Sequence, residues 1–314
     1  MKLMKSYWLL LCAAVSILPV SAHNRNGDGA IFQAIRNNDV LLVHKLIEDG
    51  ASASQGRPDG TTPLMHAALY SDVPCMRLLM EHGADPNVAN AAGATALMWS
   101  VHDPEKVALL LDKGADVRAR TKAGRTALLI AARQQGKADV IRMLLARGAD
   151  PKDKDGMGGT ALMLAAEAGD LEVVTLLVEK GVEVNAQAHP AFGAPHFGNL
   201  MPDFVKAHSG EPPAGPTALT LAVAADNADV VRFLLEHGAE VNVRALGGFN
   251  PLLVSARHKQ TAIVRMLLAA GADPNSTEYR GATPLIAAAA SDDFSTEMIA
   301  LLLDAGADPR AKDK

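Results

Sequence analysis

Apolar and polar residues alternate along this chain in blocks that return at a nearly constant spacing. One block is a leucine pair, a few mostly polar residues and then Gly-Ala-Asp or a near copy, as in LLMEHGADPN and LLLDAGADPR. Most intervals between successive block glycines lie within a few residues of ~33. Such a period predicts short helices stacked in a repeat array rather than one globular domain. The block glycines are Gly50, Gly83, Gly114, Gly148, Gly181, Gly238, Gly271 and Gly306.

A second block precedes each helix pair and reads Gly-x-Thr-Pro/Ala-Leu before an alanine-rich stretch, as in GTTPLMHAA and GATPLIAAA. Its threonine hydroxyl can accept hydrogen bonds from the free amides of a helix start, and its proline fits the first helical position. Alanine pairs such as Ala67-Ala68 allow neighbouring helices to approach closely, and leucine pairs such as Leu144-Leu145 fill the seam between repeats. The block glycine supplies the left-handed residue that ends the second helix. Each repeat is therefore predicted to be a helix pair followed by a turn.

These blocks resemble the ankyrin repeat family, in copies that run in register from about Asp28 to Lys314. The resemblance implies an all-α repeat solenoid of about eight helix-turn-helix repeats, with β-turn tips stacked along one edge. In the family the four residues that begin with the threonine often end in histidine, but here apolar residues such as Met65 hold most of these positions. We therefore expect apolar packing in place of the family's His–Thr hydrogen bonds. His66 and Trp99, one position further on, are expected to stack in the core.

The first 22 residues have the three parts of a cleavable signal peptide. Lys2 and Lys5 form a positive region, an apolar run follows, and Val20-Ser21-Ala22 offers small side chains for cleavage after Ala22. A retained membrane anchor is the alternative, but the apolar run is shorter than the ~20 residues that span a bilayer. We therefore expect residues 1–22 to be a signal peptide, and residues 23–314 to be a periplasmic or secreted repeat domain without a membrane span.

The net charge and the cysteine content of the chain argue against several classes of function. The formal net charge of −5 becomes −7 once Lys2 and Lys5 are removed with the signal peptide, and no long run of lysine or arginine occurs. A mildly acidic chain of this kind is a poor candidate for binding nucleic acid or an anionic membrane surface. Cys12 lies in the export segment, so the mature chain keeps only Cys75 and no internal disulfide is expected.

One interval breaks the period. The stretch from Gly181 to Gly238 is much longer than the others, which implies an insertion at about 187–215 that extends a turn tip beside the concave face. A long loop with its own apolar residues is usually functional or self-packed, and both readings stay open. Its three histidines are loosely spaced and lack a cysteine or carboxylate pair, so no metal site is predicted. The residues concerned are Phe192, Phe197, Phe204, His189, His196 and His208.

No catalytic or cofactor-binding motif stands out in the sequence. It contains no Gly-x-Ser-x-Gly, no phosphate-binding Gly-Lys-Ser/Thr loop, no His-Glu-x-x-His and no haem-attaching Cys-x-x-Cys-His. The glycines are explained by the repeat turns, and the acids are spread along solvent faces. We therefore expect a binding protein that is not an enzyme and that carries no cofactor or metal.

The resemblance also implies where a partner binds, because ankyrin arrays typically use their concave face. That face comprises the turn tips and the exposed residues after each alanine pair. Tyrosine and arginine, which are enriched in binding hot spots, recur there. Together with the insertion, the face gives ten candidate partner-binding residues. These are Tyr70, His102, Arg125, Arg133, Phe197, Phe204, Phe249, Arg257, Tyr279 and Arg280.

We predict a protein–protein interaction scaffold in the periplasm or outside the cell, which binds another protein through the concave face and the insertion. The chain looks similar to bacterial periplasmic ankyrin proteins, some of which are linked to supporting catalase or other redox enzymes. Two alternatives stay open. The final helix, at about Glu297 to Asp304, is as apolar as an interior copy, so the array could be the ankyrin domain of a larger exported redox or haem enzyme. The insertion could also bind a ligand directly.

Overall fold

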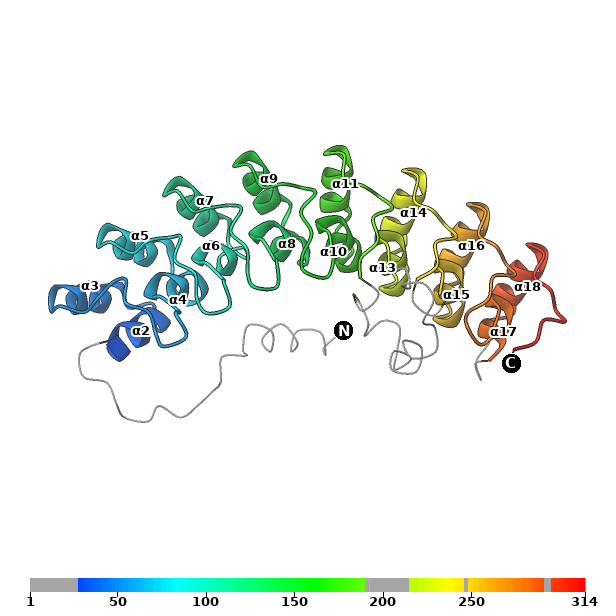
Figure 1. Cartoon of the computed structure of the whole chain (residues 1–314), viewed down its shortest axis with the longest axis horizontal. Helices are drawn as coiled ribbons and strands as arrows, with labels where there is room; N and C mark the ends of the chain where they lie inside the picture. Colours follow the sequence, from blue (N-terminus) through cyan, green and yellow to red (C-terminus); the bar gives the residue numbers. More distant parts are fainter. Residues whose placement is uncertain (1–27, 190–191, 193–214, 246–247, 291–294, 314) are drawn as a thin grey trace.

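The chain forms a curved stack of helix pairs in the computed structural model, which describes residues 28–189, 192, 215–245, 248–290 and 295–313 (Figure 1). These residues contain sixteen helices, and the only β-type pairing among them is one antiparallel bridge between Lys154 and Thr160. The expected all-α repeat solenoid of eight helix pairs is therefore confirmed.

The helices form two layers along the arc (Figure 1). The first helix of each pair lies on the concave side, and we call these helices the inner layer. The second helix lies on the convex side, in the outer layer. The inner layer consists of α2 (Asp28–Arg36), α4 (Pro63–Tyr70), α6 (Ala96–Trp99), α8 (Ala127–Ala132), α10 (Ala161–Ala168), α13 (Ala218–Ala224), α15 (Pro251–Arg257) and α17 (Pro284–Ala289). The outer layer consists of α3 (Val40–Glu48), α5 (Val73–Glu81), α7 (Pro104–Asp112), α9 (Ala138–Ala146), α11 (Leu171–Glu179), α14 (Ala228–Glu236), α16 (Thr261–Ala269) and α18 (Thr296–Asp304).

The inner helices begin as the threonine block predicts. The hydroxyl of Thr62 accepts a hydrogen bond from the Met65 amide at 3.2 Å, and Pro63 occupies the first turn of α4. The same cap recurs at Thr126, Thr160, Thr217 and Thr283. Thr95 is the exception, because its hydroxyl accepts no such bond and is buried without a partner. Consistent with a weaker start, α6 has only four residues.

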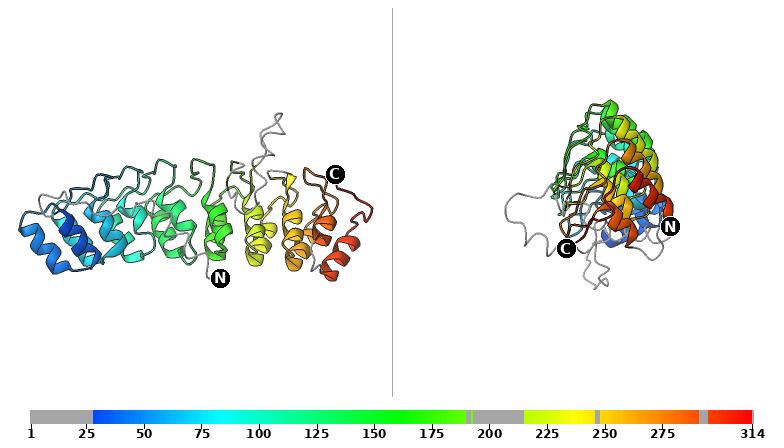
Figure 2. Two further views of the ribbon diagram at one scale, coloured as in Figure 1. Left: turned by 90° about the horizontal axis from the view of Figure 1, so that it is seen from below. Right: turned by 90° about the vertical axis from the view of Figure 1, so that its right-hand side faces the viewer.

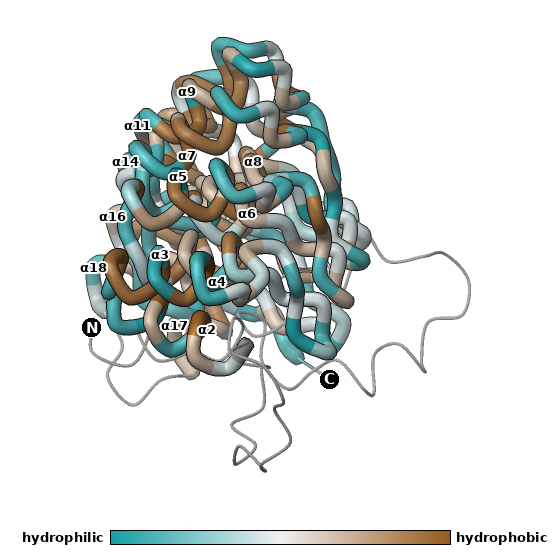
Figure 3. Tube along the Cα trace, turned by 90° about the vertical axis from the view of Figure 1, so that its left-hand side faces the viewer, coloured by the Kyte–Doolittle hydropathy of each residue, from teal (hydrophilic) through white to brown (hydrophobic). Residues whose placement is uncertain are grey.

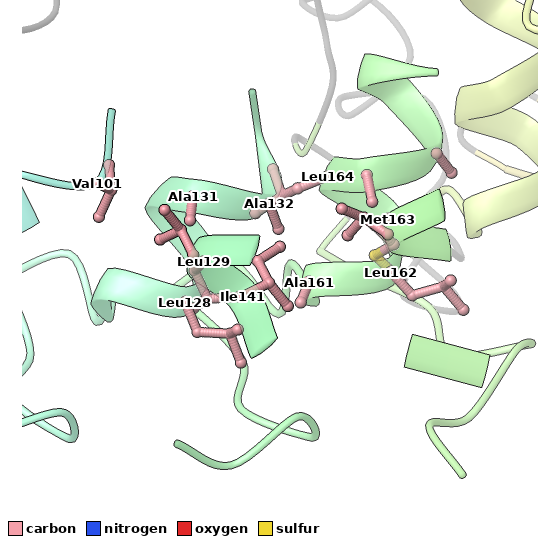
Figure 4. Close-up of a cluster of buried hydrophobic side chains, with 14 of the residues drawn as sticks. Val101, Leu128, Leu129, Ala131, Ala132, Ile141, Ala161, Leu162, Met163 and Leu164 are labelled. Atoms are coloured by element: carbon pink, nitrogen blue, oxygen red, sulfur yellow. The ribbon is translucent and has the colours of Figure 1, made fainter. Parts of the chain in front are cut away.

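Buried apolar side chains of both layers form one core cluster. Hydrophobic positions gather along the helices, and the turns that join them are mostly hydrophilic (Figure 3). Leu128, Leu129 and Ile141 of one repeat meet the Ala161–Leu164 segment of the next in a continuous cluster (Figure 4). The position where the family often has histidine is buried, with Met65 at 0% and Leu129 at 1% exposure. The expected apolar replacement of the His–Thr lattice is therefore confirmed.

Asparagine side chains join successive repeats along the turn edge. Asn242 donates its Nδ2 to the Gly271 carbonyl at 3.0 Å, and its Oδ1 accepts from the Asp273 amide at 2.9 Å. We call this pair of bonds the asparagine clip. The clip recurs at three other junctions. At each of them the asparagine bonds to the carbonyl of the block glycine, whose backbone is left-handed. The other clips start at Asn87, Asn185 and Asn275.

A second set of bonds caps some of the inner helices from the following repeat. Gln260, at the start of α16, donates to the Val223 carbonyl of α13 at 2.8 Å. Asn227, at the start of α14, donates to the Ala166 carbonyl of α10 at 2.8 Å. The last carbonyls of a helix have no partner within it. At these junctions one repeat therefore completes the hydrogen bonding of the one before it, which couples the two repeats beyond their apolar seam.

Candidate interaction surface

The concave surface combines the inner layer with the turn tips that stack along one edge of the array (Figure 2). Of the residues predicted to bind a partner, Tyr70 is 46% exposed on this surface, and three arginines are exposed there. Three further candidates are partly exposed. The arginines are Arg133, Arg257 and Arg280, and the partly exposed residues are His102, Arg125 and Tyr279. Phe197 and Phe204 lie outside the described residues.

Phe249 is not available to a partner, contrary to the sequence-based expectation. Its side chain is 7% exposed and belongs to the apolar core. The residue lies at the base of a turn, where its carbonyl accepts from the Ala245 amide at 2.7 Å, immediately before the helix cap Asn250. The turn therefore folds the ring inward, and Phe249 stabilises the repeat instead of presenting a contact.

The first aromatic residue of the insertion is also structural. Phe192 is 8% exposed, and its ring lies so close to Gly159 that a side chain at that glycine would overlap it. The nearby His189 amide donates to the Met157 carbonyl at 2.7 Å. The start of the insertion is thus packed onto the fifth repeat, which supports self-packing for this part of the loop.

An aromatic and cationic cluster occupies the N-terminal end of the concave surface. The Arg57 guanidinium lies 4.1 Å from the centroid of the Phe32 ring, which meets His66 edge-on at 5.3 Å between ring centroids. His66 in turn contacts Tyr70 at 4.6 Å, and Arg36 lies 5.6 Å from the Tyr70 centroid. Because these residues come from the first two repeats, the cluster holds the first inner helix onto the second and fixes the exposed Tyr70 ring.

His66 is neutral in this setting. Its side chain is buried, and burial together with the positive charges of Arg57 and Arg36 lowers the pKa of His66 to about 4. Its Nε2 has no hydrogen-bond partner. The expected stack with Trp99 is wrong, because within the described residues His66 makes its ring contacts with Phe32 and Tyr70. The contact with Phe32 could have been predicted from the sequence, because Phe32 is the aromatic residue of the preceding inner helix.

His102 faces a buried seam as well as the concave surface. Its Nδ1 is buried without a hydrogen-bond partner, and burial followed by the nearby Lys106 lowers the pKa of His102. Lys106 is itself 5% exposed and donates to the Ala68 carbonyl at 3.1 Å, with Asp103 at 3.9 Å. Burial raises the pKa of the neighbouring Cys75 thiol, which therefore stays protonated and unreactive. This cluster closes a repeat junction and has no nucleophilic character.

The turn tips of the fourth and fifth repeats are cross-linked by charge. Arg120 pairs with Asp153 and also donates to the Lys154 carbonyl at 3.2 Å. Arg125 lies 4.0 Å from a carboxylate oxygen of Asp155. Arg125 therefore belongs to a pair that stabilises two adjacent turns, and its guanidinium is only partly free for a partner.

Comparison with known proteins decides the family. A sequence profile described as Ankyrin repeats (3 copies) matches residues 31–121, 103–188, 196–278 and 248–313. The chain belongs to the ankyrin repeat family. Ankyrin repeats indicate in general a protein–protein interaction scaffold, and they typically carry no catalytic groups of their own.

Curated relatives share single stretches of this ankyrin array. Human 2-5A-dependent ribonuclease is 41% identical over 66 residues, which are 21% of this chain and 9% of the ribonuclease. Human mitochondrial disaggregase is 31% identical over 83 residues, or 26% of this chain and 12% of the disaggregase. Zygote-specific protein 3 of Chlamydomonas reinhardtii is 37% identical over 67 residues, or 21% and 18%. The ankyrin array therefore matches only a small part of each relative's length.

No helix in the described part of the ankyrin array is both long and apolar enough to cross a membrane. No group of three or more His, Cys, Asp or Glu side chains in that part is placed to hold a metal ion. His189 lies within the described residues, whereas His196 and His208 lie outside them.

Proposed function

We propose that this ankyrin array is a non-catalytic scaffold, exported from the cytoplasm, that binds a protein partner across its concave surface and its insertion. The observation that carries the proposal is the Tyr70 ring, which is 46% exposed although it packs against the His66 ring and lies beneath the Arg36 guanidinium. A large aromatic side chain that is ordered before binding loses little conformational freedom on contact. Such residues are typical anchors of protein interfaces.

Partner binding can be tested by capture on the immobilised full chain. We expect Tyr70→Ala to weaken capture of the bound protein by at least about tenfold, or ~1.4 kcal/mol. Leu171→Ala is the matched control, since Leu171 is an apolar residue of similar exposure, 38%, in the outer layer. Equal binding by wild type and Tyr70→Ala, with circular dichroism unchanged, would argue against the concave surface as the site.

The insertion is tested separately with Phe197→Ala and Phe204→Ala, and with deletion of residues 193–213. The deletion keeps Phe192 and His189, because both make contacts with the fifth repeat. We expect helicity to survive, since loop-closure entropy changes slowly with length, while capture of the partner falls by about tenfold. Unchanged capture by all three variants would confine binding to the concave surface.

Export is proposed from the pattern of residues 1–22. When the full reading frame is expressed in a bacterium, we expect the protein outside the cytoplasm with a mature N-terminus at His23. The measurement is cell fractionation followed by N-terminal sequencing. A soluble cytoplasmic product that begins at Met1 would contradict export, and the scaffold proposal would then apply to a cytoplasmic protein.

A second candidate function is the ankyrin domain of a larger exported redox or haem enzyme. The observation in its favour is the last repeat, where Leu303 is 42% exposed and the core positions Leu285 and Ile286 are only partly buried. The equivalent Leu252 and Leu253 of the preceding repeat are at most 1% exposed. Haem or flavin absorbance in the protein purified from its natural source would favour this candidate, and an absorbance spectrum without a cofactor band would remove it.

A further inference from the structure

The two layers of the array differ in charge. Each outer segment begins at the residue before an outer helix and ends two residues after the block glycine that follows it. Acidic residues outnumber basic residues in six of the eight outer segments. The turn and inner helix of the fourth repeat, residues 118–136, contain five basic residues and no acid. Residues 242–259, in the seventh repeat, contain three basic residues and no acid. The modest net charge of the chain therefore hides an acidic outer layer and two basic stretches on the concave side, in the fourth and seventh repeats.

Most arginines of the outer layer are neutralised by neighbouring acids. Arg142, Arg232 and Arg265 lie 3.0, 3.2 and 2.7 Å from carboxylate oxygens of the same or the next outer helix. Arg147 pairs with Asp112 across a repeat junction. These pairs neutralise most arginines of the outer layer, and the excess of acids in most outer segments leaves that layer acidic overall.

Several bases on the concave side have no such partner, among them three exposed side chains of the fourth and seventh repeats. Lys122 at the fourth turn tip, Arg133 after α8 and Arg257 at the end of α15 are all exposed, and none makes an ion pair within the described residues. Arg133 and Arg257 each stand seven residues after the N-cap of their helix, so they occupy the same place on the inner layer in different repeats. We call these three residues the basic stripe. Lys122 and Arg133 lie in the fourth repeat and Arg257 in the seventh, and the place equivalent to Arg133 is held by Glu167 in the fifth repeat and by Ala224 in the sixth.

We propose that the basic stripe binds an acidic, extended segment of the protein partner. This inference rests on the proposed scaffold function and names the chemistry of its partner. Carboxylates of such a segment would neutralise bases that nothing within the described array neutralises. Charge complementarity of this kind sets specificity and speeds association.

The spacing of the stripe favours a protein over a nucleic acid. A nucleic-acid backbone presents one phosphate per nucleotide, and proteins that bind it use many closely spaced bases. Here the bases of the stripe are few, and Glu167, an acid that a phosphate backbone would repel, holds the equivalent place in the repeat after Arg133. Two apolar side chains, Tyr70 at 46% and Met157 at 39% exposure, also lie in the turn and inner segments. A segment that alternates acidic and apolar residues matches this mixture.

The test uses the full chain and two synthetic peptides with a fluorescent label. One peptide alternates glutamate with leucine and alanine, and the second has lysine in place of glutamate. The test variant is Lys122→Glu/Arg133→Glu/Arg257→Glu. The control variant is Lys45→Glu/Arg77→Glu/Lys180→Glu, which makes the same change in charge at exposed positions of the outer layer that carry no ion pair within the described residues. Circular dichroism checks that both variants stay folded.

We expect the acidic peptide to bind the wild type in fluorescence anisotropy titrations, and the affinity to fall as salt is raised. The stripe variant should lose at least about tenfold in affinity, and the control variant less than about threefold. Any binding of the lysine peptide, which the acidic outer layer attracts, should not weaken in the stripe variant. Equal losses in the two variants, or no binding of the acidic peptide at low salt, would overturn the proposal.

Other occupants give distinguishable results. A single-stranded oligonucleotide that binds the wild type more tightly than the acidic peptide would overturn the proposal in favour of nucleic acid. Oligomers in sedimentation that dissociate in the stripe variant would show that the stripe instead binds the acidic outer layer of a second copy. If the stripe variant still captures the natural partner while Tyr70→Ala does not, the scaffold function stands and the acidic segment is wrong.

Discussion

Replacing Leu144 with alanine is expected to lower the free energy of unfolding by about 2–5 kcal/mol. Leu144 is 0% exposed and lies on α9, within the cluster of apolar side chains between neighbouring repeats. Its truncation removes apolar contacts and leaves a cavity in a seam that has helices on both sides. The free energy is measured by urea denaturation followed by circular dichroism.

Leu41→Ala is the matched control for this prediction, because the substitution is the same and the Leu41 side chain is 85% exposed. Its effect should lie within about 0.5 kcal/mol. Asp59, at a turn tip, is a poorer control, since its carboxylate accepts from the Thr61 amide at 2.9 Å. Equal losses at Leu144 and Leu41 would mean that stability does not reside in the seams.

Acidification is expected to destabilise the N-terminal repeats through His66. The group is neutral in the folded chain, with its pKa lowered to about 4 by burial, Arg57 and Arg36. In the unfolded chain it takes up a proton near its ordinary pKa of ~6.5. Between these values the unfolded state binds more protons, so stability falls as the pH falls from about 6.5 towards 4. The shift corresponds to a loss of about 2–3 kcal/mol from this one group.

Carboxylates titrate in the same range, so the measurement is a comparison with His66→Leu. Leucine suits the site because Leu164 and Leu221 hold the equivalent position in other repeats, where both are buried. Denaturation at pH 7.5 and 4.5 should show a smaller loss of stability in the variant than in the wild type. Parallel losses in the two proteins would show that His66 does not change its protonation on unfolding.

Features set by residues within one repeat could be predicted from the sequence. The helix caps at Thr62 and Thr126 and the glycine ends of the outer helices depend on a few neighbouring residues. Because these signals recur in each copy, the register of the whole array follows from them. Gly148, for example, adopts a φ of 91°, which only glycine reaches without strain.

Features set by contacts between repeats could not be predicted in the same way. Nothing near His102 in the sequence indicates that its Nδ1 faces a seam closed by Lys106. The burial of Phe249 depends on how its turn folds against the core, and the turn block alone does not fix that direction. The exposed candidates Arg133 and Arg257 were predictable, because they follow the alanine-rich stretch at a constant distance. Their role as partner contacts stays a prediction, as does the export segment.

The asparagine clip explains how an ankyrin array can change its number of copies and accept new loops. Asn185 bonds to the Gly238 carbonyl at 3.0 Å and to the Glu240 amide at 2.9 Å, across the whole insertion. At Asn242 the corresponding partners are about thirty residues away along the chain, yet the geometry is the same. When unequal genetic exchange adds or removes a whole repeat, the asparagine of one repeat again meets the glycine carbonyl and the amide of the next. An exchange within a helix does not restore this pairing. At the four junctions that carry the clip, a whole repeat or new sequence at the turn can therefore be gained or lost while the bonds of the junction stay the same.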